Sequence, residues 1–278
     1  MYDEVKLKSK LVDMMKWFHQ FCEENSLTYY AVGGTMLGAV RHKGFIPWDD
    51  DIDVGMPRED YNKLCKLIGN RLTGKYYLET PETEARDFFY PYGKLYDTTT
   101  TLAENTALKI KRGIFIDIFP LDGLGDTEQE ASKYLKKVLW FQNFYLARVL
   151  AVRKGRSFIK NAATVVVKII PQFIINDRNL RLKLVDKCRK FGFYDFEYVS
   201  NITGNWGMKE MMPREFFGEP TLYDFEDMRI YGAQNYEGYL KSLYGDWRKL
   251  PPKEKRVTHH DFILMDLDKS YLTDNEDR

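Results

Sequence analysis

A run of four carboxylates in five positions, Asp49, Asp50, Asp51 and Asp53, constrains this sequence more than any other feature. Like charges this close repel each other. In a strand, alternate side chains share a face, which predicts that Asp51 and Asp53, with Asp49 if the strand extends that far, project on one side. A hard divalent cation would relieve the repulsion, since Mg²⁺ prefers one or two carboxylates plus substrate phosphate oxygens and water, and Mn²⁺ is a possible substitute. The run therefore predicts a metal site at a strand end.

Three other interpretations of the run compete with this one. A solvated acidic turn is disfavoured because the flanking residues are apolar: Trp48, Ile52, Val54 and Met56. An EF-hand loop starting at Asp49 would need Gly at its sixth position and Glu at its twelfth, where this chain has Val54 and Asp60. The metal-binding D-x-D of nucleotide-sugar glycosyltransferases uses the same carboxylate, metal and diphosphate chemistry, and it stays open on this run alone.

Two further features indicate which chemistry the acidic run serves. Gly33-Gly34-Thr35 lies between an expected strand at 27–32 and an expected helix at 36–40, where free amides and the helix dipole attract phosphate. Asp117 interrupts the apolar strand 113–119, and burying it is costly unless it is paired or metal-bound. The order of these motifs is that of the nucleotidyltransferase fold. A structural ion pair between Asp117 and Arg112 is the alternative.

The remaining pattern predicts an α+β fold in which helices flank a mixed sheet, with a helical insertion and a mixed C-terminal part. Helices are expected from residue 7 to about 25, at 58–70, from 127 to about 152, within 157–192 and at 234–243. Strands are expected at 76–78, 92–96 and 113–119, the last ended by Pro120 and a turn at 121–123. We expect a catalytic core at 1–152, a substrate region packed on it at 153–270, and a flexible tail at 271–278.

Charge, cysteine content and apolar windows limit the kinds of partner and the compartment that we expect for this protein. Lys plus Arg number 42 against 41 for Asp plus Glu, and a net charge of +1 gives no global field for a nucleic acid, so none is expected as a partner. Three widely spaced cysteines and no visible signal peptide favour a cytoplasmic protein. The apolar window 162–175 is shorter than the ~20 residues that span a bilayer. Residues 157–175 are expected either to contact a membrane surface or to form a buried helix.

The block from Gly33 to Met56, with its Gly-Gly-Thr, Arg-His and Pro-Trp-Asp-Asp-Asp-Ile-Asp elements, resembles the LicD family of phosphocholine transferases. Further resemblance runs through 117–123, Tyr244-Gly-Asp-Trp247 and 250–252. It implies transfer of a phospho-alcohol, commonly phosphocholine, from a CDP-linked donor such as CDP-choline to a hydroxyl of a cell-surface glycan such as teichoic acid or lipopolysaccharide, free or lipid-linked. The fukutin-related group, which moves phosphoribitol, is similar in this block.

The resemblance also implies roles for individual residues. Asp51 and Asp53 are expected to hold Mg²⁺ with Asp49 or Asp50 nearby, and Asp117 is expected to be the third carboxylate, completing the metal site or taking a proton. The expected donor-phosphate contacts are Gly33, Gly34 and Thr35, then Arg41, His42 and Lys94. His259 and His260 are expected to be exposed tail residues. A glycosyltransferase and a catalytically silent glycan-binding relative remain the alternatives.

Overall fold

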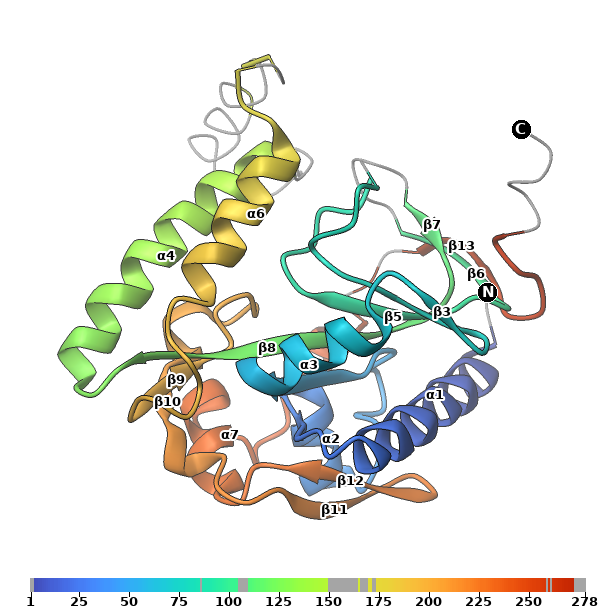
Figure 1. Ribbon diagram of the computed structural model, residues 1–278. Coiled ribbons are helices and arrows are strands. Elements are labelled where there is room, and N and C mark those ends of the chain that lie inside the picture. Colours follow the sequence, from blue (N-terminus) through green and yellow to red (C-terminus); the bar gives the residue numbers. More distant parts are fainter. Residues whose placement is uncertain are drawn as a thin grey trace.

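The computed structural model describes residues 3–85, 87–104, 110–149, 165, 170–171, 174–258, 260 and 262–272. Within these ranges the chain is a mixed sheet flanked by helices, so the predicted α+β class is confirmed. Figure 1 shows the sheet crossing the molecule, with a long helical hairpin projecting from one end. Most of the window 157–175, residue 259 and the tail from 273 lie outside the described residues.

Among the described residues, the main sheet has ten strands, in the order β11-β12-β1-β2-β8-β5-β4-β3, with β9 attached to β8 and β10 attached to β9. β2 pairs in parallel with β8, as β1 does with β12, and the other pairs are antiparallel. The bounds are β1 Tyr30–Ala31, β2 Asp53–Pro57, β3 Leu72–Thr73, β4 Tyr76–Glu79, β5 Gly93–Asp97, β8 Phe115–Gly125, β9 Tyr198–Ser200, β10 Met212–Pro213, β11 Thr221–Phe225 and β12 Met228–Gly232.

A second, three-stranded sheet has the order β13-β6-β7. Its strands are β6 Thr101–Glu104, β7 Lys111–Arg112 and β13 Phe262–Asp266. Because β13 is antiparallel to β6, the C-terminal segment returns to the first half of the chain. The segment just before β13 is thereby brought to the edge of the main sheet where the acidic run lies.

Helices pack against both faces of the main sheet. The long α1, Glu4–Glu24, is capped by Asp3, whose carboxylate accepts from the Lys6 amide at 3.0 Å. On its side of the sheet, Tyr29 contacts Phe18, with ring centroids 5.3 Å apart. On the other side, Tyr30 contacts Phe217, which packs against Tyr239. The remaining helices are α2 Gly33–His42, α3 Arg58–Ile68, α4 Glu128–Val149, α6 Asp177–Cys188, α7 Tyr236–Tyr244 and the short η1 Gly207–Glu210, η2 Arg214–Phe216 and η3 Lys253–Lys255.

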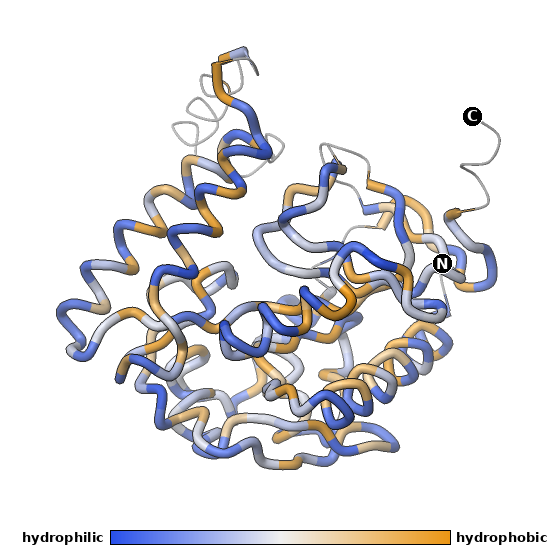
Figure 2. The backbone as a smooth tube through the Cα atoms, in the orientation of Figure 1, coloured by the Kyte–Doolittle hydropathy of each residue, from blue (hydrophilic) through white to orange (hydrophobic). Residues whose placement is uncertain are grey.

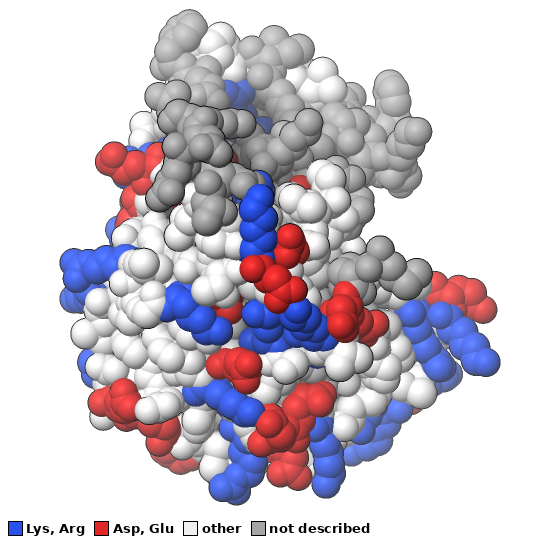
Figure 3. Space-filling model, turned by 90° about the vertical axis from the view of Figure 1, so that its right-hand side faces the viewer, with Lys and Arg blue, Asp and Glu red and all other residues white. Residues whose placement is uncertain are grey.

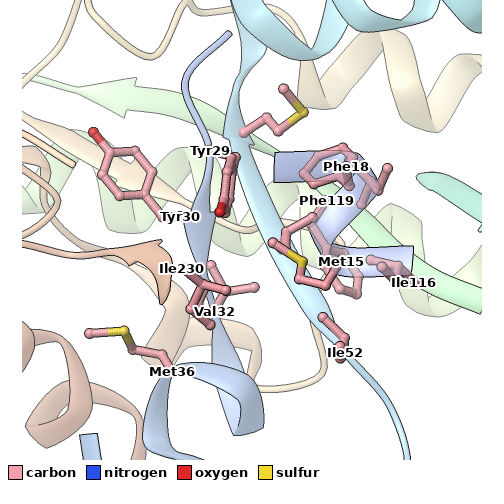
Figure 4. Close-up of a cluster of buried hydrophobic side chains, with 14 of the residues drawn as sticks. Met15, Phe18, Tyr29, Tyr30, Val32, Met36, Ile52, Ile116, Phe119 and Ile230 are labelled. Atoms are coloured by element: carbon pink, nitrogen blue, oxygen red, sulfur yellow. The ribbon is translucent and has the colours of Figure 1, made fainter. Parts of the chain in front are cut away.

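Two hydrophobic clusters hold these elements together. The larger lies between α1 and the sheet and continues to α2 and α7; Figure 4 shows Met15, Phe18, Ile52, Ile116 and Ile230 among its side chains. The smaller lies under the hairpin of α4 and α6, where hydrophobic and hydrophilic residues alternate along the helices in Figure 2. The hairpin therefore packs through one apolar stripe on each helix.

One strand differs from its predicted extent. Pro120 and the expected turn at 121–123 were predicted to end the strand that carries Asp117, but β8 continues to Gly125. Pro120 and Leu121 are still in register with β2, and beyond them Asp122 and Gly123 pair with β9. The buried Asp122 carboxylate accepts from the Arg58 guanidinium of α3 at 2.6 and 2.8 Å. Because β2, β9 and Arg58 hold residues 120–125, this segment is strand although its sequence is typical of a turn.

Surface charge and helix composition bear on the partners that the protein could contact. On the face in Figure 3, basic and acidic side chains intermingle over the described residues, so neither sign dominates it. Among the described residues, no helix combines the length and the apolar composition that crossing a bilayer requires.

Candidate active site

Asp53 and Asp117 lie side by side on neighbouring parallel strands. Asp53 is the first residue of β2, and its Cα pairs in register with that of Asp117 on β8. The Asp53 amide donates to the Thr35 hydroxyl at 2.8 Å, which ties the start of β2 to the first turn of α2. Two carboxylates from different parts of the sequence thus meet at one edge of the sheet.

The other acidic residues reach this edge from a loop. Residues 49–52 are not strand, so the expectation that alternation along one strand places Asp51 and Asp53 on one face is wrong. The Asp49 amide donates to the Ile46 carbonyl at 2.8 Å, which bends the chain before β2. Asp49 and Asp51 nevertheless lie close enough for the charge of Asp51 to act on the Asp49 carboxyl. The carboxylates converge through a turn and not through strand alternation.

Burial and mutual repulsion dominate the electrostatics of this cluster. Burial, followed by the charges of Asp51 and Asp50, raises the pKa of Asp49 to about 8. The pKa of Asp53 is raised well above its usual range by burial and by the charges of Asp51 and Asp117. Burial also raises the pKa of Asp51. Half-buried carboxylates that resist ionisation together are a donor set that fits a hard divalent cation.

Asp117 has a cationic partner that sequence reasoning did not identify as such. The Lys94 ammonium lies 3.0 Å from its carboxylate, and only 2% of the Lys94 side chain is exposed. The same ammonium lies over the ring of Phe115, 3.4 Å from its centroid. Burial raises the pKa of Asp117 to about 6, against the opposing charge of Lys94. Arg112, the expected structural partner, binds Glu79 and Asp87 instead.

The Gly-Gly-Thr motif forms the N-terminus of α2 directly beside the carboxylates. A Cβ on Gly34 would lie 2.6 Å from a carboxylate oxygen of Asp49, so a larger residue would collide with the cluster. Gly33 has φ +55°, which favours glycine, and its amide donates to the Tyr239 hydroxyl at 2.9 Å. The predicted phosphate cradle therefore lies at the site, although Thr35 and Gly33 already have protein partners there.

A cavity of about 660 Å³ opens over the cluster. Its polar lining includes Asp49, Asp51 and Asp53, together with Arg41 from the last turn of α2. Aromatic side chains complete it: Trp48, directly before the acidic run, and from later segments Trp206, Tyr244 and Trp247. The Arg41 guanidinium donates to the Trp247 carbonyl at 2.8 Å.

Not every predicted site residue lines this cavity. Asp117, Lys94 and His42 are all described by the structure, and they lie outside its lining. His42 neighbours Arg41, whose Nε lies 3.4 Å from His42 Nδ1. Asp117 lies one strand beyond Asp53, on β8, and Lys94 lies one strand beyond Asp117, on β5. The predicted residues thus divide into a group facing the cavity and a group supporting it.

Residues 26–147, which contain the glycine motif and all of these carboxylates, match the family model described as the LicD/FKTN/FKRP nucleotidyltransferase domain. The chain carries a LicD-family nucleotidyltransferase domain. Over 90% of its length and 92% of the relative's, it is 28% identical to lipopolysaccharide cholinephosphotransferase LicD of Haemophilus influenzae. An uncharacterised protein of Rickettsia typhi is 29% identical over 54% of this chain and 55% of its own. Human ribitol 5-phosphate transferase FKRP is 43% identical over 47 residues, 17% of this chain and 10% of FKRP.

Residues outside the matched LicD-family domain also reach the site. The cavity is also lined by three aromatic residues that follow this domain in sequence, Trp206, Tyr244 and Trp247. The Tyr-Gly-Asp-Trp motif indicated Tyr244 and Trp247, and nothing in the sequence analysis indicated Trp206. His260 was expected to be an exposed tail residue, and that prediction is wrong. Its Nδ1 lies 2.8 Å from Asp50 Oδ1, and its side chain is 25% exposed. Burial lowers the pKa of His260, but its hydrogen bond to Asp50 and the charge of Asp51 outweigh this and raise it to about 9.

We expect the metal-free protein to lose thermal stability between pH 5 and pH 8. Folding raises the pKa of Asp49 from 3.8 to about 8, so the folded state binds more protons than the unfolded chain in that window. The free energy of unfolding therefore falls as pH rises. A divalent cation should raise the melting temperature more at pH 8, where fewer protons compete with it, than at pH 5. Melting curves in Mg²⁺ and in chelator test this, and an equal effect of Mg²⁺ at both pH values would contradict it.

Proposed function

We propose that this protein is a divalent-metal-dependent transferase that moves a phospho-alcohol from a CDP-linked donor to a hydroxyl of a cell-surface glycan, releasing CMP. The observation that carries the proposal is the convergence of Asp49, Asp51 and Asp53 beside the N-terminus of α2 on the floor of one cavity. Carboxylates that hold a cation and a helix N-terminus that attracts phosphate are complementary to a diphosphate. The likeness to a cholinephosphotransferase over 90% of the chain supports phosphocholine as the group moved.

Asp51 and Asp53 would hold the cation, with Asp49 adjacent and Asp117 behind them. When bound, Mg²⁺ would supply charge neutralisation at the diphosphate. Arg41 lines the cavity, and its planar guanidinium would contact a donor phosphate oxygen. Lys94, held against Asp117, would offset negative charge from beneath the site. These groups make the cavity attractive to a polyanion although the cluster itself is acidic.

In the proposed reaction the acceptor hydroxyl oxygen forms a bond to the alcohol-side phosphorus, and the bond from that phosphorus to the CMP oxygen breaks. The hydroxyl proton needs an acceptor. Asp117 is our candidate base, because burial raises its pKa to about 6, near neutral pH. Since Asp117 lies outside the cavity lining, this role requires the acceptor hydroxyl to reach the strand edge where Asp117 pairs with Asp53. The aromatic wall of Trp48, Trp206, Tyr244 and Trp247 offers rings for the quaternary amine of choline or for the cytosine base.

With Mg²⁺ and a lipopolysaccharide or teichoic acid acceptor, we expect CMP to be released from CDP-choline. The same assay with CDP-ethanolamine, CDP-glycerol and CDP-ribitol ranks the alcohols. Phosphorus NMR of the product should show a new phosphodiester between alcohol and glycan. Release of UDP or GDP from a nucleotide sugar, with the sugar joined to the acceptor, would replace this proposal with the glycosyltransferase. No turnover of any donor would favour the silent glycan-binding relative.

A further inference from the structure

The C-terminal segment contributes an imidazole to the acidic cluster. Thr258 donates its hydroxyl hydrogen to Asp50 Oδ2 at 2.7 Å, and His260 Nδ1 lies 2.8 Å from Asp50 Oδ1. The pairing of β13 with β6 anchors the chain immediately after His260. The His260 ring is further confined by Phe262, stacked with its centroid 5.4 Å away. The imidazole is therefore fixed on one side, and its other nitrogen faces the cavity, which His260 lines.

That second nitrogen lies at a ligand distance from the acidic cluster. His260 Nε2 is 3.7 Å from Asp51 Oδ2. Two atoms that each bind one metal ion at about 2.1 Å are about 3.0 Å apart when adjacent and at most about 4.2 Å apart when opposite. Asp50, Asp51 and His260 can each offer a ligand atom, and these three atoms lie within 4.8 Å of one another. The spacing of Nε2 and Oδ2 thus suits a shared cation.

The roles of Asp50 and His260 follow from their hydrogen bonds. The two Asp50 oxygens already accept from Thr258 and His260, so Asp50 is placed to orient the imidazole. A histidine that binds a metal through one nitrogen usually donates the hydrogen on the other to a carboxylate, which fixes its tautomer and its direction. Here an Nδ1–H donated to Asp50 directs Nε2 toward Asp51, where a bound cation would displace the Nε2 proton.

We propose that His260 Nε2 is a ligand of the divalent cation together with Asp51, and that Asp50 is the carboxylate that orients this imidazole. This inference rests on the proposed function for the presence of the cation. It assigns to the cation a nitrogen ligand from outside the LicD-family domain, whose match ends at residue 147. A nitrogen ligand favours borderline ions such as Co²⁺ over Mg²⁺ more than an all-oxygen site does.

Pulsed EPR of the full chain loaded with Mn²⁺ alone tests the assignment. A directly bound imidazole gives a ¹⁴N modulation of the Mn²⁺ echo, and ¹⁵N-histidine labelling should convert it to the ¹⁵N signal. We expect the modulation in wild type and its loss in His260→Gln. The matched control is His19→Gln on α1, whose imidazole lies against the Tyr29 hydroxyl and outside the cavity lining, and this variant should keep the modulation. Wild type without any nitrogen modulation, or a modulation that survives His260→Gln, would overturn the assignment.

Metal affinities provide a second readout that does not depend on turnover. His260→Gln should weaken Co²⁺ binding at least about tenfold more than Mg²⁺ binding, whereas Asp50→Asn, which leaves the imidazole in place, should weaken Co²⁺ binding by about 10–100-fold. Equal losses for Co²⁺ and Mg²⁺ in His260→Gln would contradict a nitrogen ligand. If the protein turns over a CDP-alcohol but shows no nitrogen coupling, this inference fails and the proposed function stands. If it shows nitrogen coupling but turns over no CDP-alcohol, the proposed function fails and the nitrogen ligand stands.

Discussion

Replacing Asp53 with asparagine should reduce turnover by about 10³-fold or more while the metal-free protein keeps or gains thermal stability. Asp53 is surrounded by other carboxylates, and burial with the charges of Asp51 and Asp117 raises its pKa well above its usual range. Losing a cation ligand removes several kcal/mol of transition-state stabilisation, and about 4 kcal/mol corresponds to about 10³ in rate. Removing one of several like charges relieves repulsion in the folded state.

The matched control for Asp53→Asn is Asp13→Asn, an identical change at an exposed position of α1. It should leave both turnover and melting temperature unchanged. The measurements are the rate of CMP release from CDP-choline at saturating Mg²⁺ and the melting temperature in chelator. Asp53→Asn protein that keeps more than a few per cent of wild-type turnover would reject Asp53 as a metal ligand. A large drop in its metal-free melting temperature would reject the repulsion argument.

Replacing Arg58 with methionine should lower the free energy of unfolding by about 3–5 kcal/mol. Arg58 and Asp122 form a two-point ion pair that joins α3 to β8, and they are 5% and 0% exposed. The pKa of Asp122 is already raised to about 6 by burial, against the charge of Arg58. Without Arg58, the carboxylate must stay charged without its partner or take up a proton, and both states cost stability. Urea denaturation followed by circular dichroism measures the loss.

A second variant separates the buried charge from the lost packing. Combining Arg58→Met with Asp122→Leu removes both charges, and we expect it to recover most of the stability, because a buried ion pair replaced by apolar groups is often nearly neutral. The exposed pair of Arg189 with Asp186 is the control, and Arg189→Met should cost less than about 1 kcal/mol. A double variant no more stable than Arg58→Met would show that packing and not the unpaired carboxylate causes the loss.

The local sequence pattern predicted those helices and strands whose formation depends mainly on residues close to one another in the sequence. The apolar spacing along α1 and the Gly-Gly-Thr start of α2 are properties of short segments, and the structure has helices there. The acidic run also lies where it was expected, at the entry to a strand paired with the strand of Asp117. The prediction failed where it placed Asp51 in the same strand as Asp53, because the turn closed by the Asp49 amide and the Ile46 carbonyl has no strong residue signal.

The features that sequence did not predict depend on partners far along the chain. Nothing near His260 indicates that it binds Asp50, because the two residues are 210 positions apart. The continuation of β8 past Pro120 depends in the same way on β9, which begins at Tyr198. Lys94 was expected to contact donor phosphate, and its pairing with Asp117 arises from the register of β5 with β8, which composition does not encode.

The long sequence separation between the acidic run and the C-terminal residues that bind it has a consequence for biosynthesis. A ribosome adds about 5–20 residues per second, so the 210 residues that separate Asp50 from His260 take about 10–40 s to make. For most of that interval a nascent chain contains Asp49, Asp50, Asp51 and Asp53 but not the threonine and histidine that bind Asp50. β12, the parallel neighbour of β1, is also made late, at residues 228–232. This edge of the sheet is thus assembled only after residues 228–260 have been made, and a chain stalled before residue 258 would contain the acidic run without the threonine and histidine that bind Asp50.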